Sequence, residues 1–188
     1  MNENRVQKLV RELLVEIGED PEREGLRGTP ERMAKALAFL TSGYRADADA
    51  LIHRACFAQE HNNMILVRDI EIYSLCEHHM LPFFGRCHIG YIPRSKVFGV
   101  SKLARLADMF ARRLQIQERL TDQIAHVIME HVTPYGVGVV IEARHLCMMM
   151  RGVEKQNSVM TSSTVLGTFH SSHATRSEFF SLLARPHP

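Results

Sequence analysis

The order of its β-rich segments constrains the fold of this chain more than any other feature. Each segment is rich in apolar or alternating residues and ends at a turn or a change of pattern, as strands do. Two helical segments stand between the second and the third of them. The four predicted strands cover residues 64–75, 85–92, 137–149 and 159–169.

This strand–strand–helix–helix–strand–strand order predicts an α+β fold with an antiparallel sheet. We expect a four-stranded sheet with the helices on one face, followed by a tail helix that begins at Ser172 or His173. An open sheet leaves exposed edges, which are a liability unless they are paired or covered. Edge-to-edge pairing between subunits in a closed ring would remove them, so a ring-forming oligomer is expected.

The two helices between the strands are predicted from apolar residues at helical spacing. Ser101 is the expected cap of the first helix, which continues through Leu103 and Leu106. A break at residues 115–118 separates it from the second helix, which continues toward His131.

A helical region precedes the strands. Apolar residues from Val6 to Ile17 recur with helical periodicity, and Gly18 is a fitting C-cap. A second helix is expected to start with Thr29 as its N-cap and Pro30 in its first turn.

The length of 188 residues fits one domain with an N-terminal appendage. We assign residues 1–60 to the N-terminal helical region, of which 47–60 is ambiguous in type, and residues 61–188 to the catalytic domain.

Charge and cysteine usage exclude several classes of protein. Lys and Arg total 23 against 21 Asp and Glu, with no basic block or aromatic-basic interleave, so a nucleic-acid surface is not expected. No apolar segment suits a signal peptide or a membrane span, so no membrane association is expected. The four cysteines are typical of cytoplasmic thiols or metal ligands, and Cys56 and Cys87 are interpreted as structural.

Two Cys/His clusters carry the strongest chemical signal. Cys76 and His79 have the C-x-x-H spacing that lets two side chains reach one metal ion, and Cys147 could close the site. A set of three S/N ligands suits Zn²⁺ and leaves one coordination position open for water, as in catalytic zinc sites. The alternative is that both cysteines are small buried hydrophobic residues.

The two other histidines of these clusters, His78 and His145, adjoin the presumed ligands and are candidates for proton transfer. The alternative is that they are hydrogen-bonded polar groups at a strand end. His145 lies two residues before Cys147 in the same predicted strand, so we expect both side chains on one face of the sheet.

A second set of candidates is cationic. Lys102 and Arg105 lie three residues apart on one face of the predicted helix, at an N-terminus that suits phosphate. Arg151 could add a third cation. Taken alone, Lys102 and Arg105 fit a solvated basic face better than a phosphate site, and Arg151 fits an ordinary charge at a strand end equally well.

Gln117 and Glu118 stand between the two helices, and an amide beside a carboxylate could read the edge of a purine. The alternative reading of Glu118 is a favourable interaction with the dipole of the following helix.

Together these motifs resemble the GTP cyclohydrolase I family, and the resemblance extends from about Thr29 to Arg185. Several blocks occur in the same order. They are Cys76-Glu77-His78-His79, Gly99 to Arg105, Gln115 to Thr121, and Glu142 to Cys147 followed by Arg151-Gly152.

The resemblance implies a role for each matched residue. It implies that the zinc ligands are Cys76, His79 and Cys147, and that the catalytic residues are His78 and His145, with Ser101 near the ribose. It also implies that the guanine edge is bound by Gln117 and Glu118, and the triphosphate by Lys102, Arg105 and Arg151.

The resemblance further implies a tunnelling fold (T-fold) in a homodecamer of two stacked pentamers, with each active site built from neighbouring subunits. GTP and water would be the substrates. Formate and 7,8-dihydroneopterin triphosphate would be the products, in the first step of folate or tetrahydrobiopterin synthesis. Which of these pathways follows, and whether a feedback regulatory protein binds, stay open at this point.

Two rival functions fit parts of the pattern. A structural zinc clip in an oligomeric purine-binding regulator predicts a fourth protein ligand and no spare histidine pair. Another T-fold enzyme that acts on a pterin or a deazaguanine predicts no set of triphosphate-binding cations.

Overall fold

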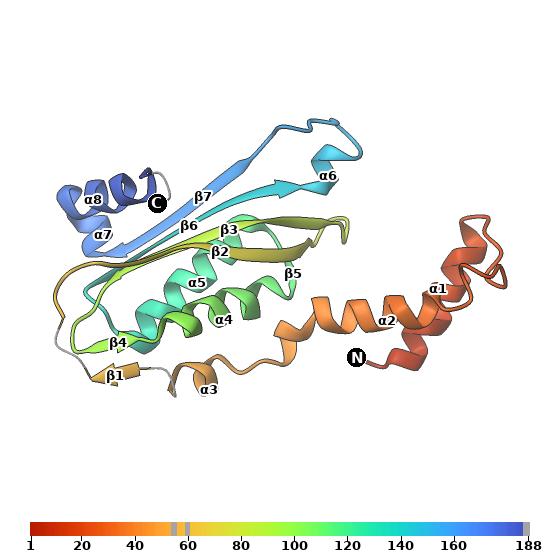
Figure 1. The fold of residues 1–188 in the computed structure, drawn as a ribbon, viewed down its shortest axis with the longest axis horizontal. Helices are drawn as coiled ribbons and strands as arrows, with labels where there is room; N and C mark the ends of the chain where they lie inside the picture. The colour runs from red at the N-terminus through yellow and green to blue at the C-terminus, as the bar shows by residue number, and fades with distance from the viewer. Residues whose placement is uncertain (54–55, 59–60, 186–188) are drawn as a thin grey trace. The chain divides into compact units, whose positions relative to one another are not determined.

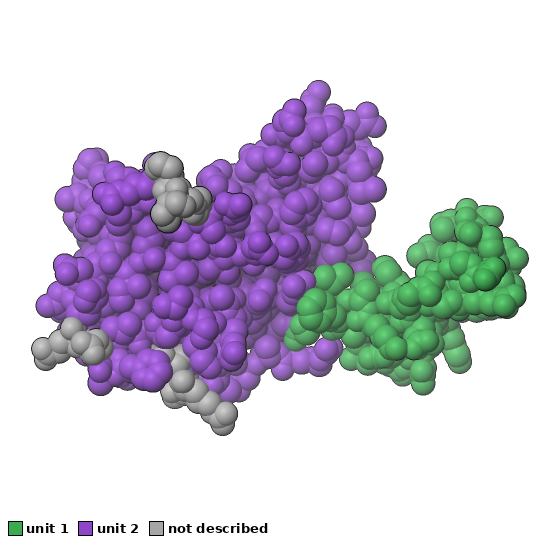
Figure 2. All heavy atoms as spheres, in the orientation of Figure 1, with its two compact units in different colours: residues 1–42 green, residues 43–188 purple. Residues whose placement is uncertain are grey.

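The computed structural model describes residues 1–53, 56–58 and 61–185, which divide into two compact units, Met1–Ser42 and Gly43–Pro188 (Figure 2). The larger compact unit thus begins at Gly43, within the residues 1–60 that the sequence analysis assigned to the N-terminal helical region. The reason is that helix α3 (Ala48–His53) packs against the helices of the larger unit, and its Ile52 is buried in their core.

The smaller unit contains helices α1 (Glu3–Glu16) and α2 (Thr29–Leu40), and the short 3₁₀ helix η1 (Ser42–Arg45) crosses to the larger unit. The Asn2 side chain caps α1, and Gly18 follows it with a φ of +88°, a conformation that favours glycine. Helix α2 begins at Thr29 itself, so its N-cap is Gly28 and the predicted cap was one residue late.

A five-stranded sheet forms the centre of the larger unit, in the order β5-β2-β3-β6-β7 (Figure 1). The predicted four strands are all present, but the predicted number was wrong. The additional strand β5 has only two residues, too few to show a periodic pattern, and pairs in parallel with the end of β2. The strands are β2 (Ile65–Cys76), β3 (Pro82–Ile92), β5 (Leu114–Gln115), β6 (Gly136–His145) and β7 (Met160–Gly167).

A separate two-stranded sheet pairs β1 (Cys56–Ala58) with β4 (Lys96–Phe98). The buried Tyr91 hydroxyl accepts a hydrogen bond from the Phe98 N–H at 2.8 Å, which holds β4 against the end of β3. The side chain of Cys56 lies outside the described side chains, whereas Cys87 is a fully buried core residue, consistent with a structural thiol.

Helices α4 (Val100–Ala111) and α5 (Gln117–Val132) cover one face of the large sheet and bury the main core (Figure 1). Helix α4 packs on β2, and α5 packs on β6 and β7. Ser101 lies inside the first turn of α4 rather than at its cap, which is Gly99. In the described ranges, none of the helices has both the length and the apolarity that a membrane span needs.

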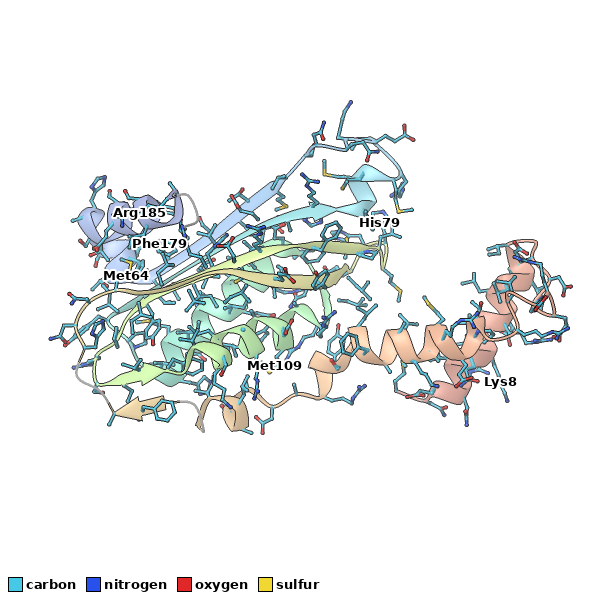
Figure 3. All side chains as sticks on the ribbon, viewed as in Figure 1. Lys8, Met64, His79, Met109, Phe179 and Arg185 are labelled. Atoms are coloured by element: carbon cyan, nitrogen blue, oxygen red, sulfur yellow. The ribbon has the colours of Figure 1, made fainter. Side chains whose placement is uncertain are left out.

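The tail helix, for which no face of the sheet was predicted, lies on the face opposite to α4 and α5. Helices α7 (Thr168–Ser171) and α8 (His173–Leu183) cover the opposite face at one end of the sheet (Figures 1 and 3). Their Phe169 and Phe179 rings form a second small core, and any side chain at Gly90 or Gly138 would collide with them. The Arg68 guanidinium binds three carbonyl groups at the end of α8.

The predicted end of the third strand, at Met149, was also wrong. Strand β6 ends at His145, and Leu146–Met149 form the helical turn α6 instead of continuing the strand. The run Leu146 to Met150 is apolar throughout, so periodicity cannot separate a strand from one helical turn there.

Candidate metal centre and active site

Three potential metal ligands meet at the end of the sheet where β2 finishes. Cys76 is the last residue of β2, His79 lies on the turn that follows, and Cys147 lies on α6. One ligand atom from each lies within 4.8 Å of the other two. Figure 3 labels His79 at this end of the sheet, near α6. The backbone therefore brings together residues that are about seventy positions apart in the chain.

A tight turn presents the first two ligands. The Cys76 N–H donates to the Leu81 carbonyl at 2.8 Å, and the Met80 N–H donates to the Cys76 carbonyl at 2.8 Å. Met80 takes a left-handed conformation with φ of +54°, which reverses the chain into β3. The C-x-x-H spacing thus spans a hydrogen-bonded turn, and both side chains can reach one ion.

The donor set suits a divalent, thiophilic cation. Burial and then the neighbouring Cys76 sulfur raise the pKa of Cys147, because two adjacent thiolates would repel each other in a partly desolvated place. A dication removes this repulsion and takes both sulfurs as thiolates. Two sulfurs and one imidazole nitrogen fit zinc, and a group of three leaves a fourth position for water or substrate.

The two remaining histidines lie beside these ligands. The Nδ1 atom of His78 is 3.7 Å from the Cys76 sulfur. His145, the last residue of β6, stacks on the Phe83 ring with centroids 4.7 Å apart and an interplanar angle of 9°. Burial lowers the pKa of His145, and the nearby Glu118 carboxylate partly offsets this shift. Neither imidazole belongs to the group of three ligands; His78 contacts the group through Cys76, and His145 precedes the ligand Cys147 by two residues.

We expected His145 and Cys147 to lie on one face of the same strand, and this prediction was wrong. They do not alternate along one strand, because the strand ends at His145 and Cys147 sits on α6.

Arg151 also lies at this end of the molecule. Its guanidinium donates to the Nε2 atom of His79 at 2.7 Å, so Arg151 is within reach of a ligand bound at the metal centre. The side chain is exposed, and it is one of the three cations predicted to bind phosphate.

Gln117 and Glu118 point in different directions from the start of α5. Glu118 is exposed and lines a pocket of about 340 Å³ together with the first turns of α5 and strand β7. Gln117 is 1% exposed, and its amide contacts backbone groups of β6 and β7 and the His145 ring. Of the two side chains, only that of Glu118 lines this pocket.

Sequence reasoning missed the residues that anchor the ligand turn. Glu77 forms an ion pair with Arg119 of α5, and this contact holds the pKa of the Glu77 carboxyl below its usual range. Arg119 also donates to the Gln115 amide oxygen at 3.0 Å and to the Leu114 carbonyl at 3.1 Å. The Glu77 N–H donates to the Gln115 carbonyl at 3.0 Å. The pairing of β5 with β2 brings these segments together, so the network could not be found from the sequence.

The structure does not bring the first turns of α4 to the metal ligands of the same chain. Ser101 and Lys102 lie in the first turn of α4 near β4, Arg105 lies one turn further on, and the helix then runs along the sheet toward β5 (Figure 1). Strand β5 pairs with Cys76, so the metal set lies beyond the far end of α4. At a rise of 1.5 Å per residue, the ten steps from Ser101 to Ala111 span about 15 Å, and the six steps from Arg105 to Ala111 span about 9 Å.

The geometry therefore separates the candidate residues into two groups. One group comprises the potential metal ligands with their neighbours, and His145 with the two residues that act on its ring: Cys76, His78, His79, Gln117, Glu118, His145, Cys147 and Arg151. The other group lies in the first half of α4 and comprises Ser101, Lys102 and Arg105.

Comparison with known proteins agrees with the motif pattern. A family model described as GTP cyclohydrolase I matches residues 6–184. A protein named GTP cyclohydrolase 1 from Leptospira biflexa serovar Patoc is 60% identical over 178 residues, which make up 95% of this chain and 97% of the relative.

Two further relatives have the same name. The one from Methylococcus capsulatus is 57% identical over 180 residues, or 96% of this chain and 97% of the relative. The one from Coxiella burnetii strain Dugway 5J108-111 is 56% identical over 182 residues, or 97% of this chain and 99% of the relative.

Proposed function

The chain belongs to the GTP cyclohydrolase I family and is a hydrolase, and from this premise we propose that it hydrolyses GTP at C8 of the purine in a zinc-dependent reaction. The products would be formate and 7,8-dihydroneopterin triphosphate, which would serve folate or tetrahydrobiopterin synthesis. The observation that carries the proposal is the set Cys76, His79 and Cys147, whose ligand atoms lie within 4.8 Å of one another. His78 and His145 adjoin this set.

Three protein ligands support a catalytic rather than a purely structural metal. Cys76, His79 and Cys147 would hold the ion, and among the described residues no fourth donor joins their group. Zinc, when bound, supplies Lewis acidity that makes a water molecule nucleophilic near neutral pH. The purine imidazole ring resists attack by ordinary water, so this chemistry matches the need of the reaction.

The two adjacent histidines would move the protons. C8 becomes electrophilic when N7 is protonated, and His145 would supply that proton because its ring lies beside the metal set, stacked on Phe83. His78, beside the Cys76 sulfur, would serve the later proton transfers of ring opening, rearrangement and reclosure. Ser101 would lie near the ribose, whose ring oxygen must be protonated when the sugar opens.

Glu118 would recognise the guanine. Its carboxylate lines the pocket beside β7 and can accept hydrogen bonds from the N1–H and the exocyclic amino group of guanine, which are adjacent donors. Adenine presents an acceptor at N1 and would leave the carboxylate facing a lone pair. The same residue would therefore discriminate between the two purines.

The triphosphate would be bound by Lys102, Arg105 and Arg151. Arg151 lies at the metal centre, whereas Lys102 and Arg105 lie in the first half of α4, about 13 Å and 9 Å of helix before its end at Ala111. We propose that a neighbouring chain supplies Lys102 and Arg105 to each metal centre. The separation supports the proposal that active sites form between neighbouring subunits.

The open edges of the sheet support a ring. In the described residues, β7 pairs only with β6, and β2 pairs with β5 only at Leu75 and Cys76. Both edges thus keep unpaired backbone groups along most of their length, which favours pairing between chains. We propose that β7 of one chain pairs with β2 of the next in a T-fold ring, and that two pentamers form a homodecamer.

Two free thiols among the metal ligands favour the cytoplasm as the site of action. In an oxidising compartment, Cys76 and Cys147 would be at risk of forming a disulfide in place of the metal site.

A single incubation tests the proposed function. Purified zinc-loaded protein should convert GTP with release of one equivalent of formate and formation of a product that becomes a fluorescent pterin on oxidation. Cys147→Ala should lose both bound zinc and formate release, while Cys87→Ala, which alters a buried thiol away from the site, should keep both. Formate release by the zinc-free Cys147→Ala protein at the normal rate would refute zinc dependence.

A further inference from the structure

The amide orientation of Gln117 is fixed by its surroundings. Its Nε2 atom lies 2.9 Å from the Ile141 carbonyl of β6 and 2.9 Å from the Met160 carbonyl of β7. The Ser162 hydroxyl oxygen is a third neighbour of Nε2 at 3.1 Å. Carbonyl oxygens only accept hydrogen bonds, so the NH₂ side of the amide must face them. The amide oxygen then points the other way.

That oxygen faces the imidazole of His145. The distance from Gln117 Oε1 to His145 Nε2 is 2.8 Å, and an amide oxygen can only accept. Nε2 must therefore carry a hydrogen. In the neutral imidazole the lone pair is then at Nδ1, and the stacked Phe83 ring restrains the plane in which it points.

The position of Gln117 on α5 explains why it cannot also bind substrate. It is the first residue of the helix, buried between α5, β6 and β7, while the next residue, Glu118, faces the pocket. Turning the amide toward a ligand would remove its hydrogen bonds to the buried Ile141 carbonyl and the part-buried Met160 carbonyl, which is unfavourable.

We infer that Gln117 is a positioning residue, which keeps the Nε2 proton of His145 in place so that Nδ1 is the atom that takes up a proton from solvent and passes that proton to the substrate. The inference rests on the proposed role of His145 in proton transfer to the purine. It replaces the contact with the guanine edge that the sequence resemblance implied for Gln117, and leaves that contact to Glu118 alone.

The first arm of the test examines the wild-type protein without turnover. The protein would be labelled with ¹⁵N in its histidine rings, loaded with zinc, and studied by NMR at pH 8, with the His145 signals identified by their loss in His145→Asn. We expect a protonated Nε2 and an unprotonated Nδ1. A signal pattern of the opposite tautomer would overturn the inference, whatever the activity of the enzyme.

The second arm separates positioning from substrate binding. Gln117→Met keeps the length of the side chain but removes the acceptor, so kcat should fall about 10- to 100-fold, as it does when groups that orient an active-site residue are lost. KM for GTP should change less than twofold, and the His145 signals should show both tautomers.

The matched control is the neighbouring Glu118→Gln. It should raise KM for GTP and leave the tautomer of His145 unchanged. If Gln117→Met instead raises KM with kcat unchanged, Gln117 contacts the substrate and the inference is wrong. If Gln117→Met does not fold, the wild-type NMR result alone decides. Failure of the wild-type protein to release formate would reject the proposed function, but would leave the tautomer measurement intact.

Discussion

At the scale of single residues, each exposed cation can be tested for its contribution to substrate binding. Hydrogen bonds from charged groups are typically worth about 1.5–3 kcal/mol. Arg105→Ala should therefore raise KM for GTP about tenfold or more, and should hardly change the binding of guanosine, which lacks phosphate. Steady-state kinetics and calorimetry would measure the two effects. An equal loss for GTP and guanosine would contradict the phosphate role.

The buried His88 predicts how stability depends on pH. Its Nδ1 atom accepts from the Asp69 N–H at 3.1 Å, so the folded protein holds the neutral ring. Burial lowers the pKa of His88, against the opposing effects of the carboxylates Asp69 and Glu142, and Arg68 and Arg86 lower it further. Because the unfolded chain binds this proton more readily, stability should fall as pH drops below about 6.5, the ordinary histidine pKa.

Thermal unfolding between pH 7.5 and 5.5 would measure this dependence. His88→Gln keeps an acceptor for the Asp69 N–H but cannot titrate, so its melting temperature should decline less steeply than that of the wild type. Parallel declines in the two proteins would show that other groups cause the effect.

At the scale of elements, the contact between α5 and the ligand turn predicts a coupled pair. Arg119→Met and Glu77→Gln each break the ion pair that holds the turn, and each should weaken zinc binding about 10- to 100-fold. The double variant should lose little more than Arg119→Met alone, because Arg119→Met already removes the contact that Glu77→Gln breaks.

Competition with a zinc-sensitive dye would measure these affinities. Arg86→Met, which breaks an ion pair with Asp69 elsewhere on the sheet, serves as the control and should leave zinc affinity unchanged. Fully additive losses in the double variant would show that Arg119 and Glu77 act independently.

The elements also show which parts of the fold could be predicted from the sequence. The strands β2, β3, β6 and β7 were predicted because their apolar or alternating residues extend over many positions. Strand β5 could not be predicted, since its two residues are defined only by their pairing with β2. The side of the sheet covered by α8 was also not predictable, because its adjacent Phe179 and Phe180 give no clear apolar stripe.

The same limit applies to the candidate site. Spacing and residue type predicted the metal group Cys76, His79 and Cys147. They could not show that Gln117 points inward while Glu118 points outward, because that depends on how α5 packs against β6 and β7. Pairs such as Glu77 and Arg119 are set by the tertiary fold in the same way.

At the scale of the whole molecule, the proposed sharing of sites between chains predicts complementation. Cys147→Ala removes the metal from a chain, and Arg105→Ala impairs its phosphate contact. Each protein alone should have little activity at low GTP. Rings assembled from equal amounts of both should regain about a quarter of the wild-type activity, because random placement joins two intact halves at one site in four.

Co-expression of the two variants, followed by purification of the mixed rings, would provide the material. Rings mixed only after separate assembly are the control and should stay inactive unless subunits exchange. No recovery in rings of proven mixed composition would mean that each site is complete within one chain.

The distance between the start of α4 and the metal centre also bears on gene dosage. When each site combines the metal ligands of one chain with the cations of another, a chain that lacks both inactivates two sites. One is the site at its own metal centre, and the other is the neighbouring site to which it would supply cations. The working fraction of sites then follows the square of the intact fraction of chains. A cell expressing equal amounts of an intact and a doubly defective copy would keep about a quarter of its activity instead of half. A folded, inactive allele would therefore do more harm than a deleted one.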